Sequence, residues 1–416
     1  MKKNVKADAG LSTVVNHYNE GGHAYGSHLS PIFQTTTFGF PDVASMQAIM
    51  AGEQHGYTYS RTANPNADQI ADKYAYLEGW DLIRQQPEMD PREIVAGKAV
   101  NSGLAAISAA ILGRVRAGET VITQRDLYGN TFLFFNEFAP RVGINVVWVD
   151  DLSVESWEAA FANHPEAVLA YTETPVNPTM RIVDLTKVSE IAHSYGAWVC
   201  IDNTFATPYH QRPLTLGCDI VLHSTTKFLT GHGNVTGGAI VSKHLDYMKK
   251  DVKFVSKLMG QAPSPIDAWM ANVGLKTLEI RMERHAENGM AMAEFLNQHP
   301  AVERVYYPGL ADDPDHHLAK QQMINGFGSL LSFELKGGFE AGVKLLETLE
   351  LATFAFSLGN VDTLIQHPVS MTHMAVPPEE REKAGISDSL IRLSVGIENI
   401  EDLLGDMDRA LKIAVG

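Results

Sequence analysis

The chain of 416 residues contains only two cysteines, Cys200 and Cys218, and neither belongs to a CxxC pair. A disulfide framework and a cysteine-rich metal site are therefore excluded. Basic residues are also few, since 33 Lys and Arg stand against 49 Asp and Glu and leave a net charge of −16. This charge disfavours a nucleic-acid-binding protein, because phosphate contacts need clustered cations.

Long apolar runs are missing as well. No window approaches the roughly 20 apolar residues that span a bilayer, and no apolar stretch follows the basic first residues as it would in a secretory signal peptide. The HExxH motif does not occur and the 16 histidines are scattered, so we expect no metal ion. Apolar residues make up 45% of the chain and charged residues 20%, as in ordinary globular proteins. We therefore expect a cytoplasmic enzyme or binding protein without a membrane or nucleic-acid partner.

Hydrophobic patterning predicts alternating helices and strands from about residue 64 onward. The runs 197–201 and 219–223 are apolar on both faces, which is typical of strands buried in a parallel sheet. Strands that alternate with helices imply βαβ units and an α/β fold. Further strands are predicted at 120–123, 145–149 and 167–171, and helices at 105–115 and from 185 to a stop at Gly196.

The pattern also divides the chain into three parts. Residues 1–62 look irregular and form an arm that packs on its own core or on a neighbouring subunit. Residues 63–275 form a large domain, and residues 276–416 form a smaller one with strands at 329–333 and 390–395 and a final amphipathic helix. The segment 80–98 is predicted to be a surface excursion.

The segment Asp219–Lys227 carries the first chemical signal. Its strand ends and delivers Ser224, Thr226 and Lys227 into the following turn, where catalytic residues of open α/β sheets gather. Hydroxyls next to a lysine suit a phosphate beside an amine that forms a Schiff base, which is what pyridoxal 5′-phosphate (PLP) requires. On this motif alone, a solvated surface lysine explains the pattern equally well.

Other segments fit the same cofactor. Asp202 ends an apolar strand, where a carboxylate is costly unless paired, and a protonated pyridine nitrogen is a suitable partner. Ser102 and Gly103 open a helix whose N–H groups suit a phosphate. Asn177 suits the cofactor's phenolic oxygen and Tyr128 suits stacking on its ring. Taken alone, Asp202 also fits a helix cap, and Ser102 an ordinary capped helix.

The last strand offers a substrate clamp. Ile391, Leu393 and Val395 share one face by the period of two, so Arg392 points the other way. An arginine on a rigid strand is a good bidentate partner for an amino-acid carboxylate. An ordinary surface charge is the alternative.

Together these motifs resemble the PLP-dependent enzymes of cysteine and methionine metabolism, which include cystathionine γ-synthases and γ-lyases, methionine γ-lyases and O-acetylhomoserine sulfhydrylases. The resemblance runs nearly end to end. It rests on Ser30–Phe38, Tyr57–Pro65, Asn101–Gly103, Glu173–Pro178, Ile201–Thr204, His223–Gly233 and Leu390–Gly396. It implies the type I, aspartate-aminotransferase-like fold, with a mostly parallel sheet and a smaller C-terminal α+β domain. It also implies PLP as cofactor, an amino-acid substrate, and at least a homodimer, usually a homotetramer.

The resemblance also assigns roles to single residues. Lys227 forms the Schiff base and then moves protons between Cα and Cγ, Asp202 pairs with the pyridine nitrogen, and Tyr128 stacks on the ring and helps to protonate the leaving group. The phosphate is held by Ser102, Gly103, Leu104, Ser224 and Thr226, with Tyr59 and Arg61 reaching it from the neighbouring subunit. The substrate carboxylate is held by Ser357 and Arg392, and the cofactor oxygen by Asn177.

At two positions this sequence differs from members of the family it resembles, and both differences affect the expected substrate. Phe356 stands where many cystathionine-handling members have a Glu, and a Phe cannot accept a hydrogen bond from a substrate amino group. Phe356 therefore favours an apolar tail such as a thioether. Asn130 stands where familiar methionine γ-lyases have a Cys, and it suits a polar tail such as an acetyl ester. The sequence leans towards γ-elimination, because Gln366–His373 and the preceding Ser-Leu-Gly resemble methionine γ-lyases most, and γ-replacement on an O-acyl-homoserine with a thiol is the alternative.

Overall fold

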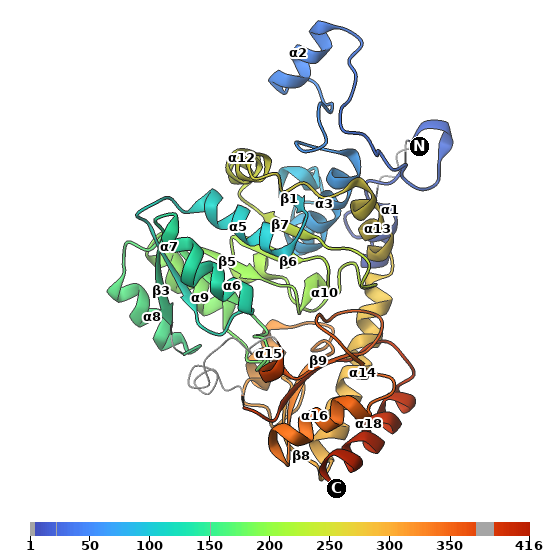
Figure 1. Cartoon of the computed structure of the whole chain (residues 1–416). Helices are drawn as coiled ribbons and strands as arrows, with labels where there is room; N and C mark the ends of the chain where they lie inside the picture. The colour runs from blue at the N-terminus through green and yellow to red at the C-terminus, as the bar shows by residue number, and fades with distance from the viewer. Residues whose placement is uncertain (1–4, 22, 150, 372–386) are drawn as a thin grey trace. The chain divides into compact units, whose positions relative to one another are not determined.

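The computed structural model describes residues 5–21, 23–149, 151–371 and 387–416 (Figure 1). The chain falls into two compact units, which we describe separately. The first consists of Met1–Arg114, Leu222–Thr230 and Asn234–Thr277, and the second of Val115–Val221, Gly231–Gly233 and Leu278–Gly416. Within the described ranges, none of the helices has the length and apolar character needed to cross a membrane.

The first unit is built around strands β1 (Ala96–Val100) and β7 (Gly238–Ser242), which pair antiparallel. The end of β6 (Ile220–Ser224) lies beside β7 in the same sheet. The α-helices of this unit are α1 (Leu11–His17), α2 (Val43–Ala51), α3 (Pro65–Glu78), α4 (Trp80–Gln85), α5 (Gly103–Arg114), α11 (Leu245–Tyr247), α12 (Lys253–Leu258) and α13 (Pro265–Leu275). Its short 3-10 and π turns are η1 (Ala24–Gly26), η2 (Pro91–Glu93) and η5 (Met248–Val252).

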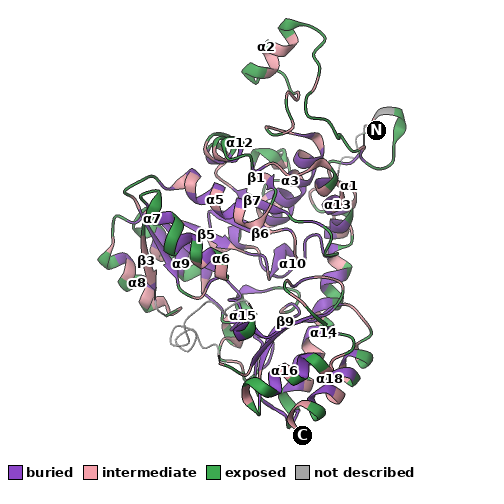
Figure 2. Ribbon diagram, viewed as in Figure 1, coloured by how far each residue is buried: buried purple, intermediate pink, exposed green. Residues whose placement is uncertain are grey.

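Helix α3 packs directly on β1. A Cβ at Gly97 of β1 would lie 2.3 Å from the carbonyl oxygen of Ala71 on α3, so only glycine permits this approach. Helix α2 behaves differently, because none of its residues is buried. Figure 1 shows the segment around α2 extending away from the rest of this unit, and Figure 2 colours most of its residues as exposed or intermediate.

The second unit begins with a parallel sheet. Strand β2 (Thr120–Gln124) pairs with β3 (Asn145–Val149) and with β4 (Leu169–Glu173), and β4 pairs with β5 (Trp198–Asp202). Strand β6 contains residues of both units. The strand order of this sheet is β1-β7-β6-β5-β4-β2-β3. The helices between these strands are α6 (Gly129–Leu133), η3 (Phe134–Phe138), α7 (Ala139–Arg141), α8 (Val154–Asn163), α9 (Leu185–Ser194), α10 (Thr207–His210) and η4 (Pro213–Leu216).

The C-terminal part of the second unit has its own five-stranded sheet, ordered β10-β11-β12-β9-β8. Its strands are β8 (Val302–Tyr306), β9 (Leu330–Leu335), β10 (Thr353–Phe354), β11 (Leu364–Gln366) and β12 (Leu390–Ser394). Its helices are α14 (Leu278–Gln298), α15 (His316–Gln322), α16 (Gly338–Thr348), η6 (Pro368–Ser370) and α18 (Ile400–Val415). One apolar core joins α14, α16 and α18 to the sheet, and it includes Leu296, Phe333, Leu345, Ile391 and Leu411.

The predicted α/β class is confirmed, as are most predicted elements. Strands 120–123 and 145–149 appear as β2 and β3, and the final helix buries Leu403, Met407 and Leu411 on one face. The strand predicted at 167–171 lies two residues later, as β4. Of the Gln366–His373 motif, residues 372 and 373 lie outside the described residues.

Two predictions were wrong. The first sixty residues contain helices: α1 buries Leu11, Val14 and Val15 at helical spacing, and α2 runs from a side-chain cap at Asp42 to a left-handed Gly52. The segment 80–98 is not simply a surface excursion. Its Trp80, Ile83 and Val95 are buried, at 4%, 2% and 1% exposure, and its exposed residues are 85–90, 92 and 93.

Candidate functional site

The turn after β6 carries the predicted cofactor lysine. The backbone N–H of Lys227 donates to the carbonyl of Ser224 at 3.2 Å, which closes the turn. Two contacts tie this turn to the start of β7. The N–H of Thr225 donates to the carbonyl of Gly237 at 3.0 Å, and the N–H of Gly237 donates to Thr226 Oγ1 at 3.0 Å. Hydrogen bonds within the turn and to the start of β7 therefore fix the backbone that leads into Lys227.

The N-terminus of α5 lies against this turn. A Cβ at Gly103 would come within 2.8 Å of the Cβ of Ser224, and one at Gly238 would lie 2.1 Å from the carbonyl oxygen of Ser102. The Ser102 hydroxyl accepts from the N–H of Ala105 at 3.1 Å, and Leu104 lies in the same first turn. Glycines thus leave a narrow cradle of backbone N–H groups and hydroxyls, and such a helix N-terminus suits a phosphate.

Helix α3 supports the turn from another side, through residues that sequence reasoning missed. His223 Nε2 lies 2.6 Å from Glu78 Oε1, and both side chains are 1% exposed. One helical turn earlier, the buried Tyr74 hydroxyl hydrogen-bonds the Thr225 side chain. Helix α3 therefore contacts residues 223 and 225, which are sequence neighbours of the predicted phosphate hydroxyls of Ser224 and Thr226. A histidine inside a buried strand was the available signal, but its partner lies 145 positions away.

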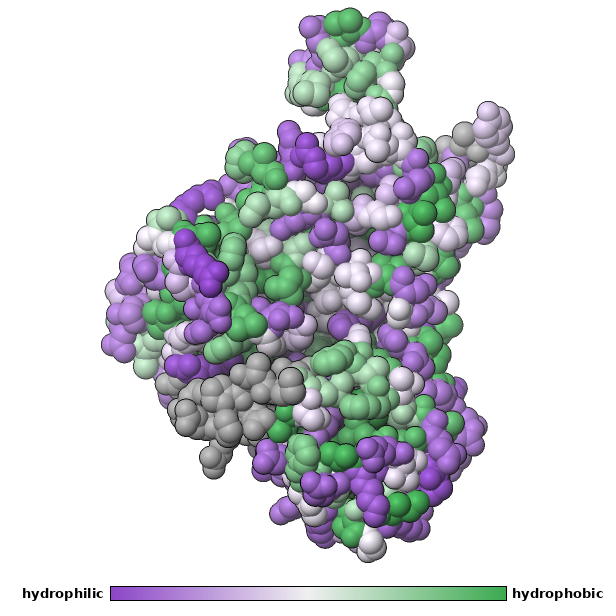
Figure 3. All heavy atoms as spheres, in the orientation of Figure 1, coloured by the Kyte–Doolittle hydropathy of each residue, from purple (hydrophilic) through white to green (hydrophobic). Residues whose placement is uncertain are grey.

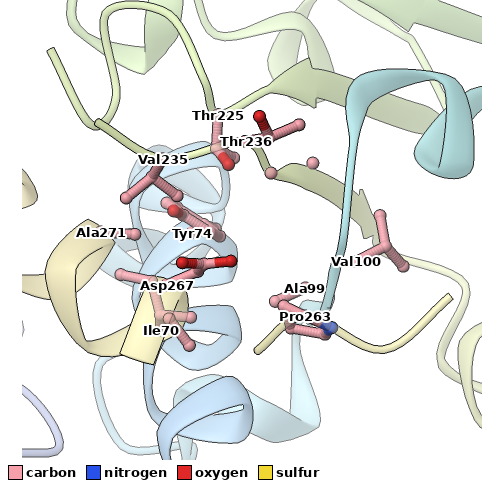
Figure 4. Close-up of a pocket in the computed structure, with 13 residues that line it drawn as sticks. Ile70, Tyr74, Ala99, Val100, Thr225, Val235, Thr236, Pro263, Asp267 and Ala271 are labelled. Carbon is pink, nitrogen blue, oxygen red and sulfur yellow. The ribbon is translucent and has the colours of Figure 1, made fainter. Parts of the chain in front are cut away.

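A small pocket lies on the Thr225 side of this turn (Figure 4). Its lining includes Tyr74, Thr225, Thr236 and Asp267 among apolar side chains. Lys227 does not line it. We therefore assign this pocket no part in cofactor binding.

Tyr59 and Arg61 lie on the arm of the first unit. The Arg61 guanidinium stacks on the Tyr59 ring at 5.5 Å and donates to the carbonyl of Lys257 at 2.8 Å. Tyr59 is 44% exposed and Arg61 is exposed as well. The pair is thus presented on the surface of its own unit.

In the second unit, Asp202 is the last residue of β5, as predicted. Both the backbone N–H and the hydroxyl of Thr204 donate to Asp202 Oδ1. Hydrogen bonds of this kind favour the charged carboxylate and fix its orientation. Within residues 202–204, Thr204 therefore holds the Asp202 carboxylate in a fixed position at the end of a buried strand.

Tyr128 caps the N-terminus of α6. Its backbone N–H donates to Glu173 Oε2 at 3.0 Å, and the side-chain amide of Asn130 donates to its hydroxyl at 3.0 Å. Tyr128 is 40% exposed, so its ring face is open to a ligand. Asn130 therefore contacts the hydroxyl of the residue predicted to stack on the cofactor.

Arg392 and Asn177 come together although 215 positions separate them. Arg392 is 4% exposed, and its guanidinium donates to Asn177 Oδ1 at 3.0 Å and to the carbonyl of Ser357 at 2.7 Å. Ser357 has φ +97°, a strained value for a residue with a side chain, and such strain is concentrated at functional sites. Burial lowers the pKa of Arg392 to about 10, and the guanidinium remains charged at neutral pH.

The Nε of Arg392 is buried and has no hydrogen-bond partner among the described residues. A buried cation without an acidic partner is costly, and a bound carboxylate would satisfy it. Phe356 precedes Ser357 and is 64% exposed, so its ring is available to a ligand. Across the described ranges, no group of three or more potential metal ligands comes together.

The chain's residues fit PLP on each of these counts. The cradle at Gly103 suits the phosphate, Lys227 supplies an amine in a fixed turn, and the oriented Asp202 suits a pyridinium. With the α/β architecture, these features define the class of PLP-dependent enzymes with the type I fold.

Comparison with known proteins agrees with this class. The family of Cys/Met metabolism PLP-dependent enzymes matches residues 12–412, and the chain belongs to it. An L-methionine gamma-lyase from Porphyromonas gingivalis is 45% identical over 414 residues, which cover 99% of each chain. One from Fusobacterium nucleatum is 44% identical over 97% of this chain and 98% of its own. A crystal structure of cystathionine gamma synthase from Xanthomonas oryzae, in complex with cystathionine, superposes with a TM-score of 0.89 at 37% identity, covering 98% of both chains.

Proposed function

We propose that this enzyme catalyses γ-elimination on sulfur amino acids, converting L-methionine or homocysteine with one water molecule to 2-oxobutanoate, ammonia and a thiol, or hydrogen sulfide in the case of homocysteine. The main support for an amino-acid substrate is Arg392, a buried guanidinium whose Nε lacks a hydrogen-bond partner among the described residues. A substrate α-carboxylate supplies the missing acceptor and neutralises the charge. The choice of a thioether tail rests on the similarity to L-methionine gamma-lyases and on the exposed ring of Phe356.

When bound, PLP supplies an electron sink for the negative charge that forms at the substrate Cα. The chain's residues do the rest. Arg392 and Ser357 would hold the carboxylate, and Asn177, which accepts a hydrogen bond from Arg392, would also hold the cofactor oxygen. Lys227 holds the cofactor and then moves a proton between Cα and Cγ. Asp202, oriented by Thr204, would pair with the pyridine nitrogen.

Tyr128 is assigned two tasks, stacking on the cofactor ring and protonating the departing sulfur. The amide of Asn130 holds its hydroxyl, which restricts where that proton is delivered. The phosphate is assigned to Ser102, Gly103, Leu104, Ser224 and Thr226. Tyr59 and Arg61 are assigned to the phosphate of a neighbouring subunit, because both are exposed on the arm of their own unit.

γ-Replacement on an O-acyl-homoserine with a thiol is the second candidate. It shares every step up to departure of the Cγ substituent, and the similarity to a cystathionine gamma synthase keeps it open. Asn130 favours it, because an amide can hydrogen-bond an acyl ester.

The first experiment incubates the PLP-loaded enzyme with L-methionine alone and measures 2-oxobutanoate. Rapid formation supports γ-elimination. No 2-oxobutanoate, together with a new amino acid formed from O-acetylhomoserine and a thiol, would reject γ-elimination in favour of γ-replacement.

The lysine assignment has a separate test. Lys227→Ala should abolish turnover and the yellow colour of the bound Schiff base. Lys187→Ala is the matched control, because Lys187 is an exposed lysine of α9 that forms a surface ion pair with Glu190. Turnover at the wild-type rate in the Lys227 variant would refute the role of Lys227.

We further propose a cytoplasmic homodimer, assembled as a homotetramer. Apolar side chains along the arm are exposed, among them Phe40, Val43 and Met50 at 36%, 68% and 70%. Figure 3 shows apolar surface over the α2 segment. Such surface is costly in water and marks an interface, so burial against a second copy explains it. Sedimentation equilibrium would reject the proposed dimer and tetramer if the protein is a monomer.

We also propose the domain boundaries 1–62, 63–275 and 276–416.

A further inference from the structure

Glu173, the last residue of β4, has no part in the roles assigned above. Its side chain is almost completely buried, at 5% exposure, and Oε2 accepts the backbone N–H of Tyr128 at 3.0 Å. The backbone N–H of Asn177 donates to the same carboxyl group. One buried carboxyl group thus contacts both residues that are predicted to face the cofactor ring.

Gln124 fixes Glu173 in place. Its side-chain amide donates to the Glu173 carbonyl at 3.1 Å, and its oxygen accepts the Glu173 N–H at 3.2 Å and the Thr172 hydroxyl at 2.6 Å. The same amide also donates to the carbonyl of Asp126 at 2.7 Å, just before Tyr128. The Glu173 carboxyl therefore stands on a backbone that cannot shift without breaking buried hydrogen bonds.

Glu173 lies directly beside Asp202, because the two residues are paired in the parallel ladder of β4 and β5. Burial first, and the negative charge of Asp202 second, raise the pKa of Glu173 to about 8. The two backbone N–H groups oppose this shift, and Asp126 adds to it. Tyr171 and Cys200 are also nearby and fully buried, and burial raises the pKa of each, so both stay neutral. The buried Glu173 carboxyl group and the half-buried Asp202 carboxylate would repel if both were charged, so Glu173 holds a proton.

We propose that Glu173 is a positioning residue, which fixes Tyr128 and Asn177 around the cofactor through hydrogen bonds from their backbone N–H groups. At neutral pH Glu173 is the neutral partner and leaves Asp202 as the anion of the pair. At a pH above the midpoint of its titration, Glu173 becomes a second anion beside Asp202. Repulsion between the two carboxylates then disturbs the positions of Tyr128 and Asn177. This inference rests on the proposed function, because Tyr128 and Asn177 receive their roles there.

The test compares the holoenzymes of Glu173→Ala and Glu173→Gln with wild type and with Glu303→Ala, whose glutamate is exposed on β8. The PLP dissociation constant, the visible absorbance against pH, kcat and KM are measured. Glu173→Ala should raise the dissociation constant and lower kcat about tenfold each, the scale of one lost buried hydrogen bond, with a smaller change in KM. Glu173→Gln, which keeps a neutral acceptor, should stay within about threefold of wild type at pH 7.

The pH profile separates positioning from a merely structural role. Wild type should lose PLP affinity or absorbance with a midpoint of about 8 as Glu173 ionises, and Glu173→Gln should lack that transition. Persistence of the transition in Glu173→Gln would overturn the assignment of the proton. A lower melting temperature in Glu173→Ala with wild-type PLP affinity and kcat would overturn the positioning role.

The two proposals fail separately. If wild type makes no 2-oxobutanoate but Glu173→Ala still binds PLP about tenfold more weakly, the proposed reaction is wrong and the positioning role stands. If wild type turns over methionine and Glu173→Ala matches it in both measurements, only the positioning role is wrong. Should Glu173→Ala not fold, Glu173→Gln and its pH profile decide.

Discussion

The chain buries an ion pair far from the chemistry, and this pair allows a quantitative test of the fold. Lys73 on α3 is fully buried, and its ammonium donates to Glu20 Oε1 at 2.8 Å, to the Val15 carbonyl at 2.6 Å and to Asn272 Oδ1 at 2.7 Å. Lys276 lies 3.1 Å from the same Glu20 oxygen. The pair thus joins the segment after α1 to α3 and α13.

Burial lowers the pKa of Lys73 to about 8, and Glu20 opposes that shift. Burial alone would raise the pKa of Glu20, but Lys73 holds it below its ordinary value. Each charge is therefore tolerated only because of the other. Glu20→Gln keeps the shape of the side chain and removes its charge, leaving Lys73 as a buried cation without an anion. Breaking one side of a buried pair costs about 3–5 kcal/mol, and we expect the free energy of unfolding to fall by about 3 kcal/mol.

Denaturant titration of the holoenzyme measures this change. The matched control is Glu190→Gln, which removes the same charge from an exposed pair with Lys187, at 53% and 60% exposure. Exposed pairs contribute about 0–1 kcal/mol, so this control should scarcely shift the midpoint. The double variant Lys73→Met with Glu20→Leu should recover only part of the loss, because it removes the buried charges but takes a hydrogen-bond donor from the Val15 carbonyl and Asn272 Oδ1. Equal midpoints for Glu20→Gln and Glu190→Gln would refute the reasoning.

Three further predictions follow from single contacts. Burial lowers the pKa of His210 and of His285 to about 4. Below about pH 6.5 the unfolded chain binds protons at these two histidines and the folded chain does not, so the free energy of unfolding should fall as the pH drops from about 6.5 to 4. Denaturant titrations across that range would contradict this prediction if the free energy of unfolding does not change with pH. Tyr74→Phe leaves a buried threonine hydroxyl without its partner and should cost about 1 kcal/mol in the same assay; an unchanged midpoint would speak against that hydrogen bond. Gly103→Ala places a Cβ 2.8 Å from a serine Cβ and should raise the PLP dissociation constant, whereas Gly405→Ala on α18, with open space around it, should not; equal affinities would exclude the cradle.

Local pattern alone determined the α/β class and most of the strands. A strand buried on both faces reads as an apolar run, and its end is visible where polar residues begin. Asp202 and the turn that leads to Lys227 were therefore placed correctly at strand ends. The face of Arg392 followed from the period of two along β12, and its neighbours Ile391 and Leu393 do lie in the core.

Tertiary structure alone decided which side chains hold these residues in place. Glu78 reaches His223 across 145 positions, and Glu173 takes up the backbone N–H of Tyr128 across 45. No local pattern marks such partners, because a glutamate in a helix or strand has the same propensity whether it faces water or a buried N–H. Burial and pairing set the charge state of Glu173, and both depend on long-range packing that no short window of sequence contains.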